Sequence, residues 1–332
     1  MKNLKDTLAR LFAFEKLNRD EAQHLMHELA ENEYNEAQVS ALLTVYQMRA
    51  ISADELAGFR AGLLDLCLAV DLSDFDPMDL CGTGGDGKDT FNISTLSAVV
   101  TAACGVPVAK HGNTGVSSAC GSSNVMEAMG YQFTNDLEQL KRQMEKANIC
   151  FLHAPLFHPA MKNVAPIRRN LGFKTFFNML GPLVNPAKVK KQSTGVFSLE
   201  LARLYNYILQ NEEGHQYNVI HSMDGYDEVS LTSEFKCFSH VGERLYSPED
   251  LQQNRLLQSD LYGGDSVESS AKIFKHILKG EGSTAQNAAI ATNAGLAISC
   301  ATNKTLEDSM AMAHEALVSG KAEKTFKTLL EA

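Results

Sequence analysis

The feature that most constrains this fold is a change in hydrophobic period along the chain. Residues 1–68 place apolar side chains at three- and four-residue spacings, the period of helices that bury one face. From about residue 76, short apolar runs of strand length alternate with helical stretches. This alternation is typical of a mainly parallel central sheet flanked by helices. The sequence therefore predicts an α/β protein in which a small all-helical domain precedes a larger α/β domain.

The pattern also locates individual elements. Ser52 and Glu55 form a capping box that marks the start of a helix at 52–67. Further helices are expected at 18–32, 35–50, 95–105, 136–147 and, as one helix or two, at 305–332. Strands are expected at 77–81, 105–111, 149–155, 193–198 and 217–223.

Composition narrows the classes of function. The formal net charge is −10, whereas a protein that neutralises nucleic-acid phosphates needs a cationic face. The longest nearly apolar stretch, 96–109, is too short to span a bilayer, and the N-terminus lacks the apolar core of a signal peptide. The seven cysteines are scattered and include no C-x-x-C pair. We expect a soluble, cytoplasmic protein with reduced cysteines and with no nucleic-acid or membrane partner.

A glycine-rich loop follows the first expected strand. Its bare backbone lets N–H groups converge on phosphate oxygens, and a helix that begins near Ser94 adds its positive end. The spacing Gly82-x-Gly84-x-x-Gly87 matches a dinucleotide fingerprint. However, the polar segment 87–92 precedes any helix, and the next strand ends in Lys110 where that fold needs an acid. We interpret the loop as a phosphate site; the alternative is a loop that only turns the chain.

Three other segments suggest the same kind of ligand. Residues 110–124 combine a lysine, an amide and serine hydroxyls with glycines, although serine-rich loops are usually only turns. In "DGYDE", residues 224–228, the Asp-Gly pair indicates a hairpin turn but leaves Asp227 and Glu228 unexplained. Adjacent carboxylates suit Mg²⁺ bound together with substrate phosphates. Residues 162–191 hold seven Lys and Arg and no acid, which predicts an anion-attracting wall or, alternatively, a basic surface helix.

Long stretches of this sequence resemble the anthranilate phosphoribosyltransferase family. The stretches are "GTGGDGKDTFNIST", "KHGN", "FLHAPLFHPAMKNVAPIRRNLGFKTFFNMLGPLVNPA" and "DGYDE", in the same order and within a likeness that covers essentially the whole chain. The resemblance implies a glycosyltransferase of tryptophan biosynthesis that moves the phosphoribosyl group of phosphoribosyl pyrophosphate (PRPP) to the amine of anthranilate. It also implies Mg²⁺, with two ions, and a homodimer joined through the helical domains. It divides the chain into a helical domain at 1–70, to which the chain returns at 164–190, and a PRPP-binding α/β domain at 71–332.

The resemblance also assigns site residues by motif. PRPP would contact Gly82, Gly85, Asp86, Thr90, Asn92, Ile93, Ser94, Thr95, Lys110, His111, Gly112, Asn113, Thr114, Gly115, Val116, Ser117, Ser118 and Ser122. Anthranilate would contact Gly82, Asn113 and Arg168, and Mg²⁺ would contact Ser94, Asp227 and Glu228.

The chain departs from the family pattern at three positions. Thr114 stands where many members have Arg, Asn124 where many have Asp, and Tyr226 where Leu is commoner. Because Thr114 removes a positive charge, we expect backbone contact there more than side-chain contact.

No general base is assigned. Displacement of pyrophosphate from a sugar carbon, with oxocarbenium character, depends more on charge stabilisation and positioning than on a strong base. Two other functions of this fold remain alternatives. A pyrimidine nucleoside phosphorylase normally carries a "KHSTGG"-like loop, where this chain has "KHGNTG". A non-catalytic nucleic-acid-binding relative would need a broadly basic face.

Overall fold

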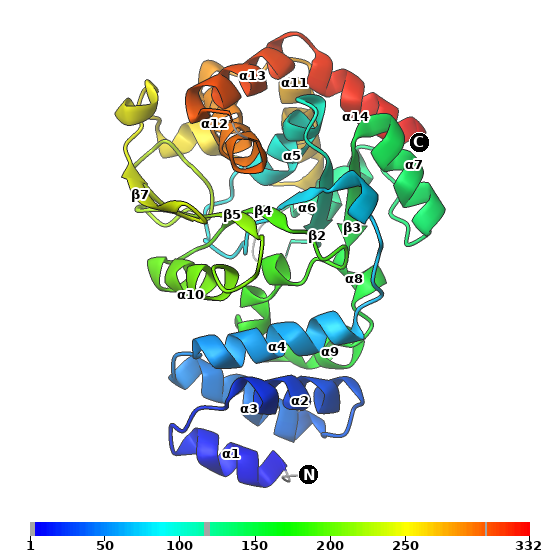
Figure 1. The fold of residues 1–332 in the computed structure, drawn as a ribbon, viewed down its shortest axis with the longest axis vertical. Helices are drawn as coiled ribbons and strands as arrows, with labels where there is room; N and C mark the ends of the chain where they lie inside the picture. The colour runs from blue at the N-terminus through cyan, green and yellow to red at the C-terminus, as the bar shows by residue number, and fades with distance from the viewer. Residues whose placement is uncertain (1–3, 116–119, 303) are drawn as a thin grey trace.

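The molecule has a helical bundle at one end and a seven-stranded sheet with its covering helices at the other (Figure 1). The computed structural model describes residues 4–115, 120–302 and 304–332. The bundle contains α1 (Leu4–Phe12), α2 (Arg19–Ala30), α3 (Glu36–Met48), α4 (Ala53–Leu66) and α9 (Met161–Leu171). Because α9 packs against α2 and α3, the chain returns to the bundle after building part of the sheet.

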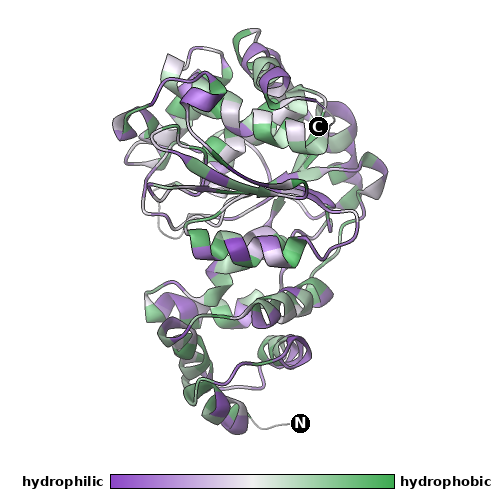
Figure 2. Ribbon diagram, turned by 60° about the vertical axis from the view of Figure 1, so that its left-hand side comes forward, coloured by the Kyte–Doolittle hydropathy of each residue, from purple (hydrophilic) through white to green (hydrophobic). Residues whose placement is uncertain are grey.

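Polar residues before the bundle helices set where these helices begin. Asn18, Asn35 and Ser52 each accept a hydrogen bond from the backbone N–H three residues later, and the side chain at that later position bonds back. The capping box predicted at Ser52 is therefore confirmed. In Figure 2 the bundle helices carry hydrophobic and hydrophilic stretches side by side, as expected for helices that bury one face.

Glu55 is the polar centre of the bundle and is fully buried. Its carboxylate pairs with the Arg49 guanidinium and accepts hydrogen bonds from the Leu17 N–H at 3.0 Å and the Tyr46 hydroxyl at 3.1 Å. Burial by itself would raise the pKa of Glu55, but the bonds from Arg49, Ser52 and Leu17 lower it below its usual value. One carboxylate thus joins the loop before α2, the end of α3 and the start of α4.

The sheet has the strand order β3-β2-β1-β4-β5-β6-β7. Its strands are β1 (Met78–Leu80), β2 (Val108–Gly112), β3 (Ile149–His153), β4 (Lys191–Gly195), β5 (Gln216–Ser222), β6 (Phe235–Ser239) and β7 (Gly242–Tyr246). Strands β1 to β5 pair in parallel, whereas β6 and β7 are antiparallel at one edge. The expected mainly parallel sheet is confirmed.

Helices cover both faces of the sheet. They are α5 (Ile93–Ala103), α6 (Ser122–Ala128), α7 (Leu137–Ala147), α8 (Ala154–Phe157), α10 (Leu199–Leu209), α11 (Val267–Leu278), α12 (Thr284–Ala301), α13 (Leu306–Val318) and α14 (Lys321–Glu331). Short 3-10 helices are η1 (Ser73–Phe75), η2 (Phe176–Met179), η3 (Gly181–Leu183), η4 (Glu249–Leu251) and η5 (Gln258–Leu261). Figure 1 shows α5 and α11 to α14 on one side of the sheet and α10 on the side that faces the bundle. No helix in the described residues is long and apolar enough to cross a membrane.

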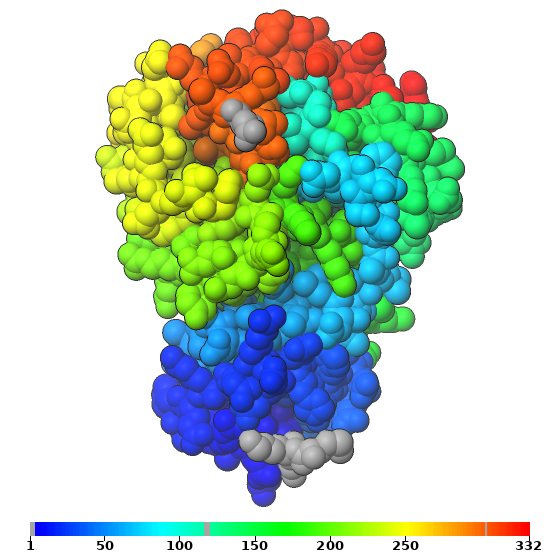
Figure 3. Space-filling view, in the orientation of Figure 1, coloured from blue at the N-terminus to red at the C-terminus, as the bar shows by residue number. Residues whose placement is uncertain are grey.

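The core of the bundle continues into the α/β part. Phe176, from the returning segment, stacks on Phe59 of α4 with ring centroids 4.4 Å apart. The same apolar cluster extends through Tyr205 of α10 to Tyr217 and Val219 of β5. Figure 3 shows the bundle, in blue, seated directly against the α/β part. The two parts therefore share a core, and the domain boundary at residues 70–71 stays a prediction.

We predict that Glu55→Ala destabilises the fold by about 3–5 kcal/mol, because it leaves Arg49 buried without its partner. The folded pKa of Glu55 is depressed, so the wild-type stabilisation exists above the unfolded pKa and disappears as pH falls through the folded value. Urea unfolding should show a large difference from wild type at pH 7 that shrinks as pH falls through the folded pKa of Glu55. The control Glu36→Ala removes an exposed acid from the first turn of α3 and should change little; equal losses in both variants would contradict the prediction.

Candidate active site

The candidate site lies where the parallel strands β1, β2 and β5 end. The glycine-rich loop at 81–92 connects β1 to α5, a second loop follows β2, and the Asp227 loop connects β5 to β6. Parallel strands bring their carboxyl ends to one edge of a sheet, which is where open α/β folds bind ligands. The Asp224–Gly225 pair turns the chain there, but the whole connection spans residues 223–234 and is not a tight hairpin.

A cavity of about 280 Å³ opens at this edge. Among the residues proposed for it, those that line it are Gly82, Gly85, Asp86, Thr90, Asn92, Ser94, Thr95, Lys110, His111, Gly112, Asn113, Thr114, Gly115, Ser122, Arg168, Asp227 and Glu228. Ile93 does not line it, because its side chain is buried in the core between α5 and the sheet. Val116, Ser117 and Ser118 lie outside the described residues.

The glycine-rich loop needs its glycines for two different reasons. Gly84 and Gly85 have φ values of +62° and +76°, a region that side-chain-bearing residues rarely adopt. Gly82 is not among the glycines with positive φ, but a Cβ there would lie 2.6 Å from Asp227 Oδ2. The Gly84 N–H donates to the same carboxylate oxygen at 2.6 Å. The loop is therefore held against the Asp227 loop.

Asp227 and Glu228 lie beside this loop, and Asp86, a third acid, belongs to the loop itself. Burial, followed by the nearby charge of Asp86, raises the pKa of Asp227 to about 7. Burial and the charges of Asp227 and Asp86 raise the pKa of Glu228 well above its usual value. Glu228 nevertheless accepts hydrogen bonds from the Ser94 N–H at 3.1 Å, at the start of α5, and from the Thr90 hydroxyl at 3.2 Å. Ionising these carboxyls is therefore unfavourable in the free protein, and a bound cation would relieve that cost.

The described residues contain no set of three His, Cys, Asp or Glu side chains arranged around one metal position. The donor chemistry nevertheless fits Mg²⁺, which is usually held by one or two carboxylates together with substrate phosphates and water. Asp227 and Glu228 are adjacent hard oxygen donors at the edge of the glycine loop.

Lys110 and His111 lie at the end of β2, and both are buried. The Lys110 ammonium donates to the Leu80 carbonyl and faces the Asp79 carboxylate. Asp79 also accepts from the His111 N–H at 3.0 Å and the Asn185 amide at 2.9 Å, and burial raises its pKa to about 6. Burial lowers the pKa of His111 to about 3, so its ring is neutral at physiological pH. Lys110 supplies a positive charge, and His111 does not.

The second loop is held by amide side chains. Asn124 Oδ1 accepts from the Gly115 N–H at 2.9 Å and the Gly121 N–H at 3.1 Å, so Asn at this position closes the loop as a neutral acceptor. The Ser122 hydroxyl donates to the Asn113 carbonyl at 3.1 Å. The Thr114 N–H donates to Asn113 Oδ1 at 2.8 Å.

Only some of the basic side chains of segment 162–191 lie near the cavity. Arg168 lines the cavity, donates to Asn178 at 3.2 Å and lies 5.2 Å from the centre of the Phe177 ring. The Lys174 ammonium donates to the Gly85 carbonyl. Lys191 instead pairs with Asp76 at the start of β4, the opposite end of the strands. The expected anion-attracting wall is thus limited to the part of the segment near Arg168 and Lys174, because the segment ends at the start of β4, at the opposite end of the strands.

Several lining residues were not singled out from the sequence. They are Cys81, Thr83, Lys88, Asp89, Cys120, Gly121, Ala154, Phe177, Asn178, Gly181 and Pro182. Four of them follow α9 inside the long stretch that resembles the known family, so the motif already contained them, although their spacing gives no sign of a site.

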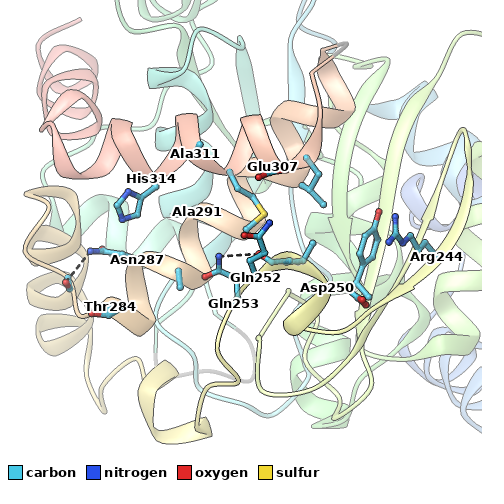
Figure 4. A pocket seen from close by; sticks show the side chains of 16 residues that line it. Arg244, Asp250, Gln252, Gln253, Thr284, Asn287, Ala291, Glu307, Ala311 and His314 are labelled. Atoms are coloured by element: carbon cyan, nitrogen blue, oxygen red, sulfur yellow. Dashed lines mark hydrogen bonds between the residues drawn. The ribbon is translucent and has the colours of Figure 1, made fainter.

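A larger cavity, of about 710 Å³, lies on another part of the molecule, between the β7–η4 region and helices α12 and α13 (Figure 4). Figure 4 shows Gln252, Gln253, Asn287 and His314 around it. None of the proposed site residues lines it. The larger volume of this cavity therefore does not make it the candidate active site. The candidate site is the smaller cavity, which is lined by the glycine loop and the buried carboxylates.

Comparisons with known proteins place the chain in a class. Residues 5–67 match the model of the glycosyl transferase family, helical bundle domain, and residues 75–323 match that of the glycosyl transferase family, a/b domain. Anthranilate phosphoribosyltransferases from Christiangramia forsetii and Bacteroides fragilis are 55% and 49% identical, over at least 98% of both chains in each case. The chain thus belongs to the anthranilate phosphoribosyltransferases within this glycosyl transferase family.

Solved structures agree with this assignment. Anthranilate phosphoribosyltransferase from Thermus thermophilus has a TM-score of 0.91 at 34% identity, covering 98% of this chain and 100% of that one. The Saccharomyces cerevisiae enzyme in complex with PRPP and Mg has a TM-score of 0.89 at 24% identity, covering 99% of this chain and 97% of that one, which shows the shared fold.

We predict that Asp227→Asn stabilises the fold at pH 8. A carboxyl with a raised folded pKa resists ionisation, so ionised Asp227 costs stability above its folded pKa and nothing below its unfolded pKa. Urea unfolding of Asp227→Asn should give a free energy of unfolding on the order of 1–3 kcal/mol above wild type at pH 8, and no gain near pH 4. Asp89→Asn, at an exposed position of the glycine loop, is the control and should be neutral. A gain that persists at pH 4 would reject the ionisation argument.

Proposed function

We propose that this chain transfers the phosphoribosyl group of PRPP to the amine of anthranilate, with release of pyrophosphate, as the second step of tryptophan biosynthesis from chorismate. The observation that carries the proposal is one cavity in which a backbone-lined glycine loop meets paired carboxylates, in a chain 55% identical to a named anthranilate phosphoribosyltransferase. Neither a nucleoside phosphorylase nor a nucleic-acid-binding protein is favoured by these relatives.

We propose that the glycine loop and the loop after β2 hold PRPP. The N–H groups around Gly82 and Gly85 and the start of α5 would face its phosphates, with Lys110 as a buried positive charge. Thr90, Asn92, Ser94, Thr95 and Ser122 would offer hydroxyl and amide groups to the ribose and phosphates, because they line the same cavity. Ile93 would act only by holding this helix start, since its side chain is in the core.

We propose that Asp227, Glu228 and Ser94 hold Mg²⁺, as two ions, together with PRPP. All three side chains offer hard oxygen donors, which Mg²⁺ prefers. The carboxylates of Asp227 and Glu228 also repel each other when both are ionised and buried. The yeast relative of the same fold was solved with PRPP and Mg. When bound, Mg²⁺ neutralises charge on the departing pyrophosphate.

Anthranilate would lie on the bundle side of the cavity, next to Gly82, Asn113 and Arg168. Arg168 presents a guanidinium from α9, held by Asn178 and stacked near Phe177, and a carboxylate is its natural partner. Burial lowers the pKa of His111 to about 3, which makes its ring a weak base, and its Nδ1 lies 3.0 Å from the Gly181 carbonyl, so we assign it no role as a base. The chain's residues then act by orienting the amine toward the sugar carbon and by holding the leaving group.

The direct test follows the fluorescence of anthranilate with PRPP and Mg²⁺ present. We expect the signal to fall with time, and to stop falling when a chelator removes Mg²⁺. Constant fluorescence at micromolar enzyme would reject the proposed function. Release of free base from a nucleoside and inorganic phosphate, with anthranilate fluorescence unchanged, would favour the phosphorylase alternative.

For Arg168→Ala, we expect the KM for anthranilate to rise by about tenfold or more, because a charged hydrogen bond to the carboxylate is lost. The KM for PRPP should change much less. Arg168→Lys should not restore the wild-type value, since one ammonium cannot form a two-pronged contact. An equal rise in both KM values would show that Arg168 acts on phosphate or on the fold.

We also propose a cytoplasmic homodimer joined through the helical bundles. Support comes from Phe12, Phe14 and Met48, apolar bundle residues that are 57%, 65% and 74% exposed. All seven cysteines are free thiols, as suits a reducing compartment. Light scattering at micromolar concentration should give twice the chain mass, and Phe14→Glu should shift it toward the monomer. A monomeric wild-type mass would refute the dimer.

A further inference from the structure

Lys174 is a cationic side chain beside the glycine loop that the roles proposed so far do not use. Lys174 follows α9, in the segment that connects the bundle to η2. Its ammonium donates to the Gly85 carbonyl. A Cβ at Gly85 would lie 3.1 Å from Lys174 Cε and 3.2 Å from Nζ, so the end of the side chain lies directly against the loop.

The bundle holds this lysine in place. Gln47, at the end of α3, donates from Nε2 to the Lys174 carbonyl at 2.5 Å. On the other side, the Lys174 ammonium lies 5.5 Å from the centre of the Phe197 ring, just after β4. Lys174 therefore reaches from the helical bundle to the loop of the α/β part, across the junction between them.

The charges that line the cavity favour a further cation once a diphosphate binds. Among the described residues that line the cavity, the acids are Asp86, Asp89, Asp227 and Glu228, and the cations are Lys88, Lys110 and Arg168. Lys110 already donates to the Leu80 carbonyl, the Lys88 ammonium lies 4.7 Å from the centre of the Tyr226 ring, and Arg168 is proposed for anthranilate. A diphosphate brings several more negative charges. A backbone carbonyl is a weaker partner for an ammonium than a phosphate oxygen, and fixing an exposed lysine on a carbonyl costs side-chain entropy.

We propose that Lys174 is a further diphosphate-binding residue, brought to the glycine loop by the helical bundle through Gln47. On binding, its ammonium exchanges the Gly85 carbonyl for an oxygen of the diphosphate. Ligand binding then ties the bundle to the α/β part through one side chain. The inference rests on the proposed function, because it assumes that the glycine loop receives the diphosphate of PRPP.

The test measures binding of inorganic pyrophosphate with Mg²⁺ to the full chain by titration calorimetry. Lys174→Gln should weaken binding by about tenfold or more, as expected for one charge-assisted hydrogen bond, and Lys174→Arg should restore most of it. The loss should shrink at high salt, because Lys174 is exposed. In steady-state assays, the same variant should raise the KM for PRPP and leave that for anthranilate nearly unchanged.

The control is Lys190→Gln, which removes the same charge from an exposed lysine before β4, at the opposite end of the strands. It should bind pyrophosphate as wild type does. Gln47→Ala should weaken binding in the same direction as Lys174→Gln, but less. Thermal unfolding checks that each variant is folded.

Several outcomes would overturn the inference. These are wild-type affinity in Lys174→Gln, an equal loss in Lys190→Gln, and no change in Gln47→Ala, the last of which removes the role of the bundle. Wild-type protein that binds pyrophosphate but leaves anthranilate unconsumed would contradict the proposed function and leave the Lys174 comparison valid. Wild-type protein that fails to bind pyrophosphate would overturn both.

Discussion

The close packing of the Asp227 loop against two glycines is the contact on which the candidate site depends. A Cβ at Gly195, at the end of β4, would lie 1.3 Å from the Asp227 carbonyl oxygen, and one at Gly82 would lie 2.6 Å from its carboxylate. Only residues without a side chain allow the ends of β1 and β4 to approach the loop after β5 this closely. The approach brings the Asp227 carboxylate to the Gly84 N–H, and so places acids and bare backbone in one cavity.

This packing has a cost in stability. Asp227 is 6% exposed, and Asp86 and Glu228 are close enough to perturb its ionisation. A chain selected only for stability would avoid buried acids that repel each other. Their presence is understandable if a cation and a ligand with many negative charges complete the site. The destabilisation of the free protein then becomes binding energy for that ligand.

The junction between the bundle and the α/β part gives the site its second wall. Phe176 stacks in the bundle core on Phe59, and Arg60 donates to the Leu183 carbonyl at 3.0 Å. The chain from α9 to these anchors places Arg168 and Asn178 at the cavity and Lys174 against the glycine loop. A movement of the bundle would therefore move Arg168, proposed for anthranilate, and Lys174, proposed for the diphosphate, together.

The sequence by itself determined the features that depend on local or periodic chemistry. Apolar spacing and the Ser52 cap predicted α2, α3, α4 and the strands β1 to β5, and the glycines and the Asp227–Glu228 pair indicated an anion and metal site. It did not predict the antiparallel strands β6 and β7, because most β7 side chains are exposed and leave no alternating pattern. Only the tertiary structure decided that Lys174 meets Gly85, 89 positions away, that Lys191 lies at the far edge, and that Ile93 belongs to the core. Contacts of this kind depend on how distant segments pack, for example when the chain returns to the bundle after β3. The spacing of residues within one segment does not specify which distant segment will pack against it.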